Sequence, residues 1–441
     1  MKKYVCIISL LCLLVACAGN KQNGTAKKPA ALPAVEDVVM YQVNPRVFAP
    51  EKSLRAVESR LDSIQALGIN VVWFMPLNEV GQEKSVNSPY CVKDYKSVNP
   101  EFGTLDEFKG LVGACHQKGM SVIIDWVANH TSWDNAWIAN KAWYTQDADG
   151  NIISPAGTGW NDVADLDFDN QEMRLAMIDA MKFWVTEIGI DGFRCDAADF
   201  VPFDFWKQAL DSLRAIPEHP LLMLAEGKRR DHFDAGFDMN YSWDFLETLR
   251  DVLVKEAPAI ALFHTDKAEY DTIPVGKVKL RFTTNHDEAA KMSPVKEFED
   301  ARGSMAAFVL TTYLHGGALI YGSQEVGYPE AINFFTYVPV DWTANGDLYQ
   351  EYQRLMALYN EYPAIRKGEM KPFANADVLL FEKQDGKDRV LVAVNVRNRE
   401  VSVALPQEWS GHVSKDLYSG SEQKLETELN LPAYQYRIFK F

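Results

Sequence analysis

The sequence predicts an α/β protein built on a closed (β/α)8 TIM barrel, with a small subdomain inserted after the third strand and a C-terminal antiparallel β-sandwich domain. Three observations support this fold class. Short apolar runs alternate with amphipathic segments from residue 38 onward, this alternation contains eight apolar runs, and it stops after Gly368.

The predicted barrel strands are short runs of apolar and β-branched residues, as buried parallel strands require. They occupy residues 38–43, 69–74, 121–125, 190–196, 221–226, 236–239, 278–284 and 318–321, and the run at 236–239 is the weakest. Between the first two runs, apolar residues recur at helical spacing from Leu54 to Ile64, and Gly68 is placed to end that helix. Further helices are predicted at 105–118, 171–188, 203–215, 243–255, 303–314 and 349–361.

The uneven spacing of these elements divides the chain into domains. The barrel is expected over 36–130 and 171–367. Residues 131–170 are dense in Trp, Asp, Gly and Asn, and we interpret them as an inserted subdomain B on the catalytic face, since an insertion after a barrel strand emerges there. Alternating strand-like segments over 368–441 predict the C-terminal β-sandwich.

The amino terminus has the pattern of an export signal. Two lysines precede an apolar segment from Tyr4 to Ala16, which is too short for an ordinary transmembrane helix. Leu14 to Cys17 resembles the bacterial lipobox and predicts a lipoprotein signal peptide over 1–16, a lipid on Cys17 that attaches the protein to a membrane, and a flexible tether over 17–35. We therefore expect an exported, lipid-anchored protein that faces the periplasm or lies on the cell surface.

Charge and cysteine content restrict the classes of partner. The formal net charge of −16 argues against nucleic acid, because phosphate binding needs a concentrated basic surface, whereas a neutral substrate is not repelled. Three of the six cysteines belong to the export signal and the lipobox. The others, Cys91, Cys115 and Cys195, lack metal-site spacing and are expected to be small buried residues.

Acidic residues stand at the carboxyl ends of four predicted strands. Asp125, Asp196 and Glu226 end their apolar runs, and Asp287 follows the seventh. Arg194 and Asp196 alone are explained equally well by a structural ion pair. Stability gives no reason for four acids to gather at one rim, however, and active sites of this fold lie at that rim.

Two carboxyl groups are what retaining glycoside hydrolysis requires, one as nucleophile and one as acid, about 5–5.5 Å apart. Arg194 would favour the ionised form of Asp196, as a nucleophile needs. Glu226 has no basic neighbour before Lys228 and is the better candidate for the protonated general acid. Asp287 could stabilise the positive charge of the transition state, and Asp125 is expected to stabilise the barrel.

Four ordered segments make a resemblance specific. DWVANHT at 125–131, GFRCDAADF at 192–200, the glutamate of LLMLAEG and FTTNHDE at 282–288 resemble the signature regions of the α-amylase family, glycoside hydrolase family 13. The likeness extends from about residue 38 to the carboxyl terminus. It implies Asp196 as nucleophile, Glu226 as general acid and base, and Asp287 as transition-state stabiliser.

The resemblance also implies binding residues. His130 and His286 would hydrogen-bond the sugar at the cleavage subsite, Tyr90 would stack beneath it, and Arg194 is expected among the substrate-binding residues. Asn129 and Asp165 align with calcium ligands of the family and imply one structural calcium ion, with solvated loop residues as the alternative. No organic cofactor is expected.

The expected function is retaining hydrolysis of α-1,4-glucosidic bonds in starch or maltooligosaccharides. An oligo-1,6-glucosidase, a cyclomaltodextrinase and a 4-α-glucanotransferase of the same family remain open, because subsite loops decide among them. Ala197 resembles members that act on α-1,4 links, whereas Asp199–Phe200 replaces a Lys-His pair of many α-amylases. A non-catalytic glycan-binding lipoprotein is the alternative from another class, and the presence of all three acids argues against it.

Overall fold

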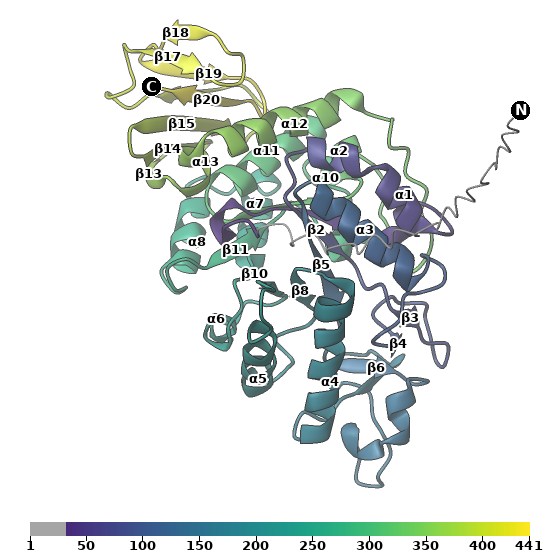
Figure 1. The fold of residues 1–441 in the computed structure, drawn as a ribbon. Helices are drawn as coiled ribbons and strands as arrows, with labels where there is room; N and C mark the ends of the chain where they lie inside the picture. Colours follow the sequence, from purple (N-terminus) through teal and green to yellow (C-terminus); the bar gives the residue numbers. More distant parts are fainter. Residues whose placement is uncertain (1–31) are drawn as a thin grey trace, which may run out of the picture.

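The computed structural model describes residues 32–441 (Figure 1). The expected signal peptide, the lipobox cysteine and most of the expected tether lie outside the described residues. Within 32–441, none of the helices combines the length and the apolar character needed to cross a membrane.

Eight parallel strands close into the expected barrel, which confirms the fold class. They are β1 (Val39–Val43), β2 (Val71–Phe74), β5 (Ser121–Trp126), β8 (Gly192–Cys195), β9 (Leu222–Ala225), β10 (Met239–Tyr241), β11 (Val278–Arg281) and β12 (Gly317–Tyr321). Neighbours pair in chain order, and β12 closes the ring on β1. Every residue of these strands is buried, which explains why their sequences read as continuous apolar runs.

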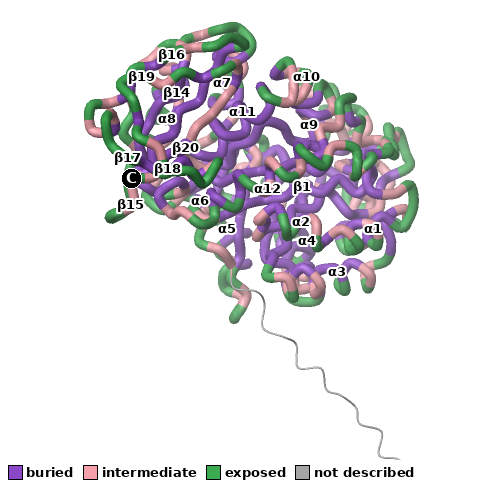
Figure 2. The backbone as a smooth tube through the Cα atoms, turned by 90° about the horizontal axis from the view of Figure 1, so that it is seen from above, coloured by how far each residue is buried: buried purple, intermediate pink, exposed green. Residues whose placement is uncertain are grey.

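Helices surround the barrel. The α-helices are α1 (Ser53–Ser59), α2 (Leu61–Ala66), α3 (Leu105–Gln117), α4 (Gln171–Phe183), α5 (Phe203–Arg214), α6 (Asp231–Ala235), α7 (Trp243–Leu253), α8 (Ala261–Tyr270), α9 (His286–Ala289), α10 (Pro294–Glu297), α11 (Ala301–Tyr313), α12 (Gly346–Glu361) and α13 (Pro363–Lys367). A π-helical turn, Trp184–Ile188, continues α4. Short 3-10 turns cover Val35–Asp37, Pro45–Val47, Ala136–Ala139, Lys141–Trp143 and Gln324–Val326. Figure 2 shows the buried backbone in the interior and the exposed segments at the periphery.

Several elements differ from the sequence-based expectation: α8 was not predicted, the seventh strand ends at Arg281 rather than Thr284, and two further differences have a clear backbone cause. The sixth strand begins at Met239 rather than Gly236, because Gly236 ends α6 in a left-handed conformation with φ of 116°. The single helix expected from Leu54 to Ile64 is two helices, α1 and α2, since the backbone of Arg60 leaves the helical region (φ −104°, ψ 2°).

Two excursions leave the catalytic end of the barrel. After β2, the chain forms the antiparallel pair β3 (Glu79–Val80) and β4 (Val92–Asp94). After β5, β6 (His130–Ser132) pairs with β7 (Val163–Asp165), and the residues between them make up the body of the inserted subdomain. β6 sets His130 opposite Asp165, so the insertion begins and ends beside the barrel.

The C-terminal domain consists of two antiparallel sheets. The larger has the order β13 (Glu369–Phe373), β14 (Val378–Asp385), β15 (Asp388–Asn395), β20 (Tyr436–Lys440), β17 (Val413–Asp416) and β18 (Glu422–Lys424). The smaller pairs β16 (Val401–Ala404) with β19 (Glu428–Leu431). Buried side chains from both sheets, including Leu391, Val403 and Trp409, form one apolar cluster between them.

Two buried basic side chains fasten this domain to the barrel. The Lys383 amine on β14 donates hydrogen bonds to the main-chain carbonyls of Leu314, Ile365 and Arg366. Arg397 donates to the carbonyls of Val252 and Ala257 at 2.7 and 2.8 Å. The three cysteines in the described part, Cys91, Cys115 and Cys195, are free and buried, as expected.

The Lys383 contact predicts a pH-dependent contribution to stability. Burial lowers the pKa of Lys383 to about 7, whereas an unfolded lysine keeps its proton to about pH 10.4. Between these values the unfolded chain binds more protons, so this group makes stability rise with pH. The free-energy difference of unfolding between wild type and Lys383→Met should grow by about 2 kcal/mol from pH 7 to pH 9, measured by urea denaturation. A difference that stays constant over this range would show that the three carbonyls keep the amine charged.

Candidate active site

One cavity at the carboxyl ends of the barrel strands collects six of the expected site residues. Its volume is about 440 Å³, and its lining includes the side chains expected for catalysis and sugar binding: Tyr90, His130, Asp196, Glu226, His286 and Asp287. Asp196 directly follows β8, Glu226 directly follows β9, and Asp287 lies in α9, after β11. The ends of three strands therefore bring the three acids to one place.

Arg194 lies beneath these acids and contacts two of them and Asp125. Its Nη1 donates to Asp125 Oδ1 at 2.6 Å and to Asp196 Oδ1 at 2.8 Å. Its Nη2 approaches Glu226 Oε1 at 2.7 Å as an ion pair, without the alignment of a hydrogen bond. Arg194 is fully buried, so the arginine and the acids compensate one another inside the fold.

The Asp196 and Glu226 carboxyl groups are neighbours because they contact different nitrogens of one guanidinium. A second contact fixes Glu226, since the Ala197 N–H donates to its Oε2 at 2.7 Å. Ala197 has φ of 43°, a left-handed conformation that alanine rarely adopts. Arg194 and the Ala197 N–H therefore hold the Asp196 and Glu226 carboxyl groups in one place.

Asp196 is electrostatically coupled to its surroundings. Burial and the nearby Glu226 raise the pKa of Asp196 well above its usual value, and Arg194 opposes this rise. Arg194 lowers the pKa of Asp196, as the sequence predicts, but burial and Glu226 raise it by more.

A chain of hydrogen bonds links the expected sugar-binding residues to this cluster. Gln42 Nε2 donates to His286 Nδ1 at 2.8 Å, which leaves the ring proton on Nε2. That nitrogen contacts the Tyr90 hydroxyl at 2.6 Å, and the hydroxyl donates to Asp125 Oδ2 at 3.1 Å. Asp125 thus connects Tyr90 to Arg194.

Both expected histidines are neutral. Burial lowers the pKa of His286 to about 3 and the pKa of His130 to about 4. His286 Nε2 also lies 3.5 Å from Asp287 Oδ2, and burial raises the pKa of that aspartate. The histidines can therefore exchange hydrogen bonds with a neutral sugar without adding positive charge beside Arg194.

Aromatic side chains form part of the cavity wall. The ring of Tyr90 stacks on His286 with centroids 5.4 Å apart, and Phe334 meets Tyr90 edge to face at 6.0 Å. Trp160 from the inserted subdomain and Phe335 complete the wall. Sequence reasoning missed Trp160, Phe334 and Phe335, although two adjacent phenylalanines in a loop after the eighth strand were a usable signal.

The residues expected to bind calcium lie next to each other but provide few ligands. Asn129 immediately precedes β6, and its Nδ2 lies 3.3 Å from His130 Nδ1, while Asp165 lies at the end of β7. Over residues 32–441, no three His, Cys, Asp or Glu side chains are grouped to hold a metal ion. Two residues fall short of the six to eight oxygens that calcium takes, so calcium stays a prediction and no step below depends on it.

Two family models match the chain. The model described as "Alpha amylase, catalytic domain" matches residues 45–151 and 157–337, and "Maltogenic Amylase, C-terminal domain" matches residues 370–438. The chain therefore belongs to the α-amylase family of glycosidases.

Individual relatives agree with this assignment. The chain is 29% identical over 380 residues to the cyclomaltodextrin glucanotransferase of Geobacillus stearothermophilus, covering 75% of this chain and 52% of that protein. It is 26% identical over 414 residues to α-amylase MalA of Haloarcula japonica, covering 90% and 60%. The chain thus spans a little over half the length of these two relatives. The crystal structure of the maltogenic α-amylase AmyB from Thermotoga neapolitana superposes with a TM-score of 0.83 at 25% identity, covering 93% and 99%.

The hydrogen-bond chain predicts a role for the Tyr90 hydroxyl. Tyr90→Phe keeps the ring but removes the group between His286 and Asp125. Because a hydrogen bond to a charged group contributes roughly 1.5–3 kcal/mol, kcat/KM on maltooligosaccharides should fall at least about tenfold. Tyr313→Phe is a matched control, since that buried hydroxyl donates only to the Leu355 carbonyl, away from the cavity. Equal kinetics in the two variants would contradict the role.

Proposed function

We propose that the protein hydrolyses α-1,4-glucosidic bonds in starch or maltooligosaccharides with retention of anomeric configuration. The observation that carries this proposal is that Asp196, Glu226 and Asp287 line one cavity, with Arg194 in contact with the first two. Family membership and the aromatic wall, which suits the apolar faces of sugar rings, support a glucan substrate.

In the first step, Asp196 attacks the anomeric carbon while Glu226 gives its proton to the glycosidic oxygen. Arg194 holds Oδ1 of Asp196, which leaves Oδ2 for the attack. The bond between the anomeric carbon and the leaving oxygen breaks, and a glycosyl ester forms on Asp196.

In the second step, Glu226 acts as a base. It takes a proton from water, the water oxygen attacks the anomeric carbon, and the ester bond to Asp196 breaks. Asp287 stabilises the positive charge that develops on the sugar ring in both steps, and neutral His130 and His286 hydrogen-bond its hydroxyl groups.

A glucanotransferase is the second candidate, and an aromatic pair at the rim of the cavity supports it. Phe200 is 59% exposed, and its ring meets Trp160 edge to face at 5.7 Å. An aromatic pair at this place can hold a sugar acceptor in competition with water. Products longer than maltoheptaose from that substrate would favour the transferase, whereas cleavage of isomaltose or pullulan would favour an α-1,6 specificity or a cyclomaltodextrinase-like one.

Substituting the acids tests the mechanism. Asp196→Asn and Glu226→Gln should each lower kcat on maltoheptaose by about 10⁴-fold or more, with Asp287→Asn similarly impaired. Asp149→Asn, on the exposed turn of the inserted subdomain, is the matched control and should leave kcat unchanged. Proton NMR of the first product should show the α-anomer. Wild-type turnover in Asp196→Asn, or an initial β-anomer, would refute the mechanism.

The lipobox-like segment supports export and attachment to a membrane through a lipid on Cys17. Incorporation of a labelled fatty acid that persists in Cys17→Ser would contradict this part of the proposal, and protease treatment of intact cells distinguishes the two membrane faces.

A further inference from the structure

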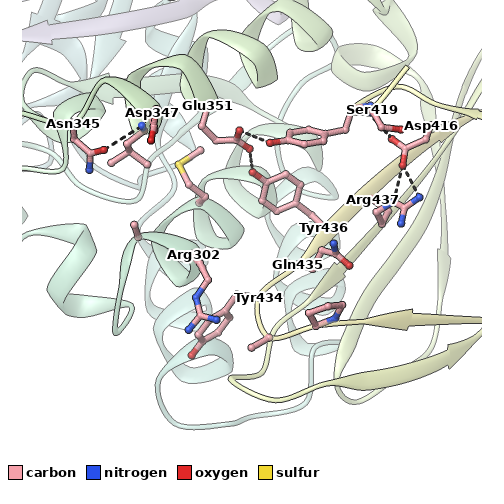
Figure 3. A pocket seen from close by; sticks show the side chains of 16 residues that line it. Arg302, Asn345, Asp347, Glu351, Asp416, Ser419, Tyr434, Gln435, Tyr436 and Arg437 are labelled. Atoms are coloured by element: carbon pink, nitrogen blue, oxygen red, sulfur yellow. Dashed lines mark hydrogen bonds and ion pairs between the residues drawn. The ribbon is translucent and has the colours of Figure 1, made fainter. Parts of the chain in front are cut away.

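A groove lies between the barrel and the C-terminal domain, apart from the catalytic cavity (Figure 3). Its volume is about 660 Å³, larger than that of the catalytic cavity. The barrel contributes residues of α11 and α12, and the C-terminal domain contributes residues around β17 and the turn before β20. None of the residues that line it takes part in the mechanism above.

Tyrosines form much of its surface. The hydroxyls of Tyr418 and Tyr436 both donate to the carboxylate of Glu351 on α12. Figure 3 marks the contact between Tyr436 and Glu351 with a dashed line. The two rings meet edge to face with centroids 5.8 Å apart. Glu351 therefore fixes the orientation of two aromatic rings, with their hydroxyls satisfied and their apolar atoms left as contact surface.

A third tyrosine is held in an unfavourable backbone conformation. Residues 432–435 form a turn in which the Gln435 N–H donates to the Pro432 carbonyl at 3.0 Å. Tyr434 occupies the third position with φ of 58°, where glycine or asparagine is preferred. Tyr434 lines the base of the groove, where its ring lies next to Gly303 of α11 and is only 2% exposed.

The charges in the groove are largely compensated by the protein itself. Arg437 pairs with Asp416 at 2.6 Å and Arg302 pairs with Asp300 at 2.7 Å. Asp347, at the rim, is the one lining charge without an ion pair or hydrogen-bonded partner in the described chain. Such a surface favours neither an anionic nor a strongly cationic ligand.

We propose that this groove is a second binding site for an α-glucan chain, an inference that rests on the proposed function. A hexose chain is neutral, has apolar ring faces that pack on tyrosine, and carries hydroxyls that can bond to Asp347, Gln435 and Ser419 at the rim. The groove holds a long polymer while the catalytic cavity acts on part of it.

Filling the groove with Ala433→Trp tests this without removing a contact between the domains, whereas Tyr418→Ala also removes the hydrogen bond to Glu351. Ala433→Trp places a bulky ring in it, and Tyr418→Ala removes one platform. The matched control is Ala404→Trp, the same change at an exposed position of β16 outside the groove. Binding of soluble starch is measured by affinity electrophoresis in the Asp196→Asn background, so that the polymer is not consumed.

We expect the dissociation constant for starch to rise at least fivefold in Ala433→Trp and Tyr418→Ala, and to stay within twofold in Ala404→Trp. With Asp196 intact, kcat/KM on maltotriose should stay within twofold in all three. Unchanged starch binding by folded Ala433→Trp overturns the second site while leaving the proposed function intact. Wild-type turnover in Asp196→Asn instead refutes the proposed function. A dimer of the wild type that dissociates in Ala433→Trp, with starch binding unchanged, would overturn the proposal in favour of a second copy as the occupant.

Discussion

The buried guanidinium of Arg194 is the constraint on which the site depends. Three carboxyl groups could not be held together inside a barrel without a compensating positive charge, because each would repel the others and lose hydration. Arg194 supplies that charge and also a planar set of donors, so the positions of Asp125, Asp196 and Glu226 are fixed together. The same contact places the Tyr90 and His286 chain, because that chain ends on Asp125.

Buried basic side chains also position the C-terminal domain against the barrel. Lys383 and Arg397 reach across the boundary and donate to main-chain carbonyls of the barrel, and Arg397 also pairs with Asp377 of its own domain. A main-chain carbonyl accepts a hydrogen bond whatever side chain its residue carries. The backbone of the barrel therefore provides the acceptors that join the two domains. The joint also creates the groove, because Glu351 of α12 contacts tyrosines of β20 and of the loop after β17.

Much of the fold was predictable because the barrel strands are buried on both sides. Continuous apolar runs and acids at their ends were enough to locate eight strands and one catalytic rim. The sixth strand was misplaced since its run is short and Gly236 reads equally well as part of a strand or as the end of a helix. Two of the three acidic partners of Arg194, Asp125 and Glu226, were not predicted, because strand alternation pairs Arg194 with Asp196 but does not show how far side chains reach from neighbouring strands.

Loop residues were the other limit. Trp160, Phe334 and Phe335 reach the cavity from segments without regular periodicity, and only the folded chain places them there. The groove could not be predicted from the sequence for the same reason, since it combines helices of the barrel with a strained turn of the C-terminal domain.

The deep burial of the two site histidines sets how the protein responds to its surroundings. With ring pKa values of about 3 for His286 and about 4 for His130, neither histidine gains a proton in a mildly acidic medium. The hydrogen bonding of these two rings is thereby uncoupled from the acidity of the surroundings, whereas Asp125, Asp196 and Asp287, whose pKa values burial raises, are the groups around the cavity that respond to it.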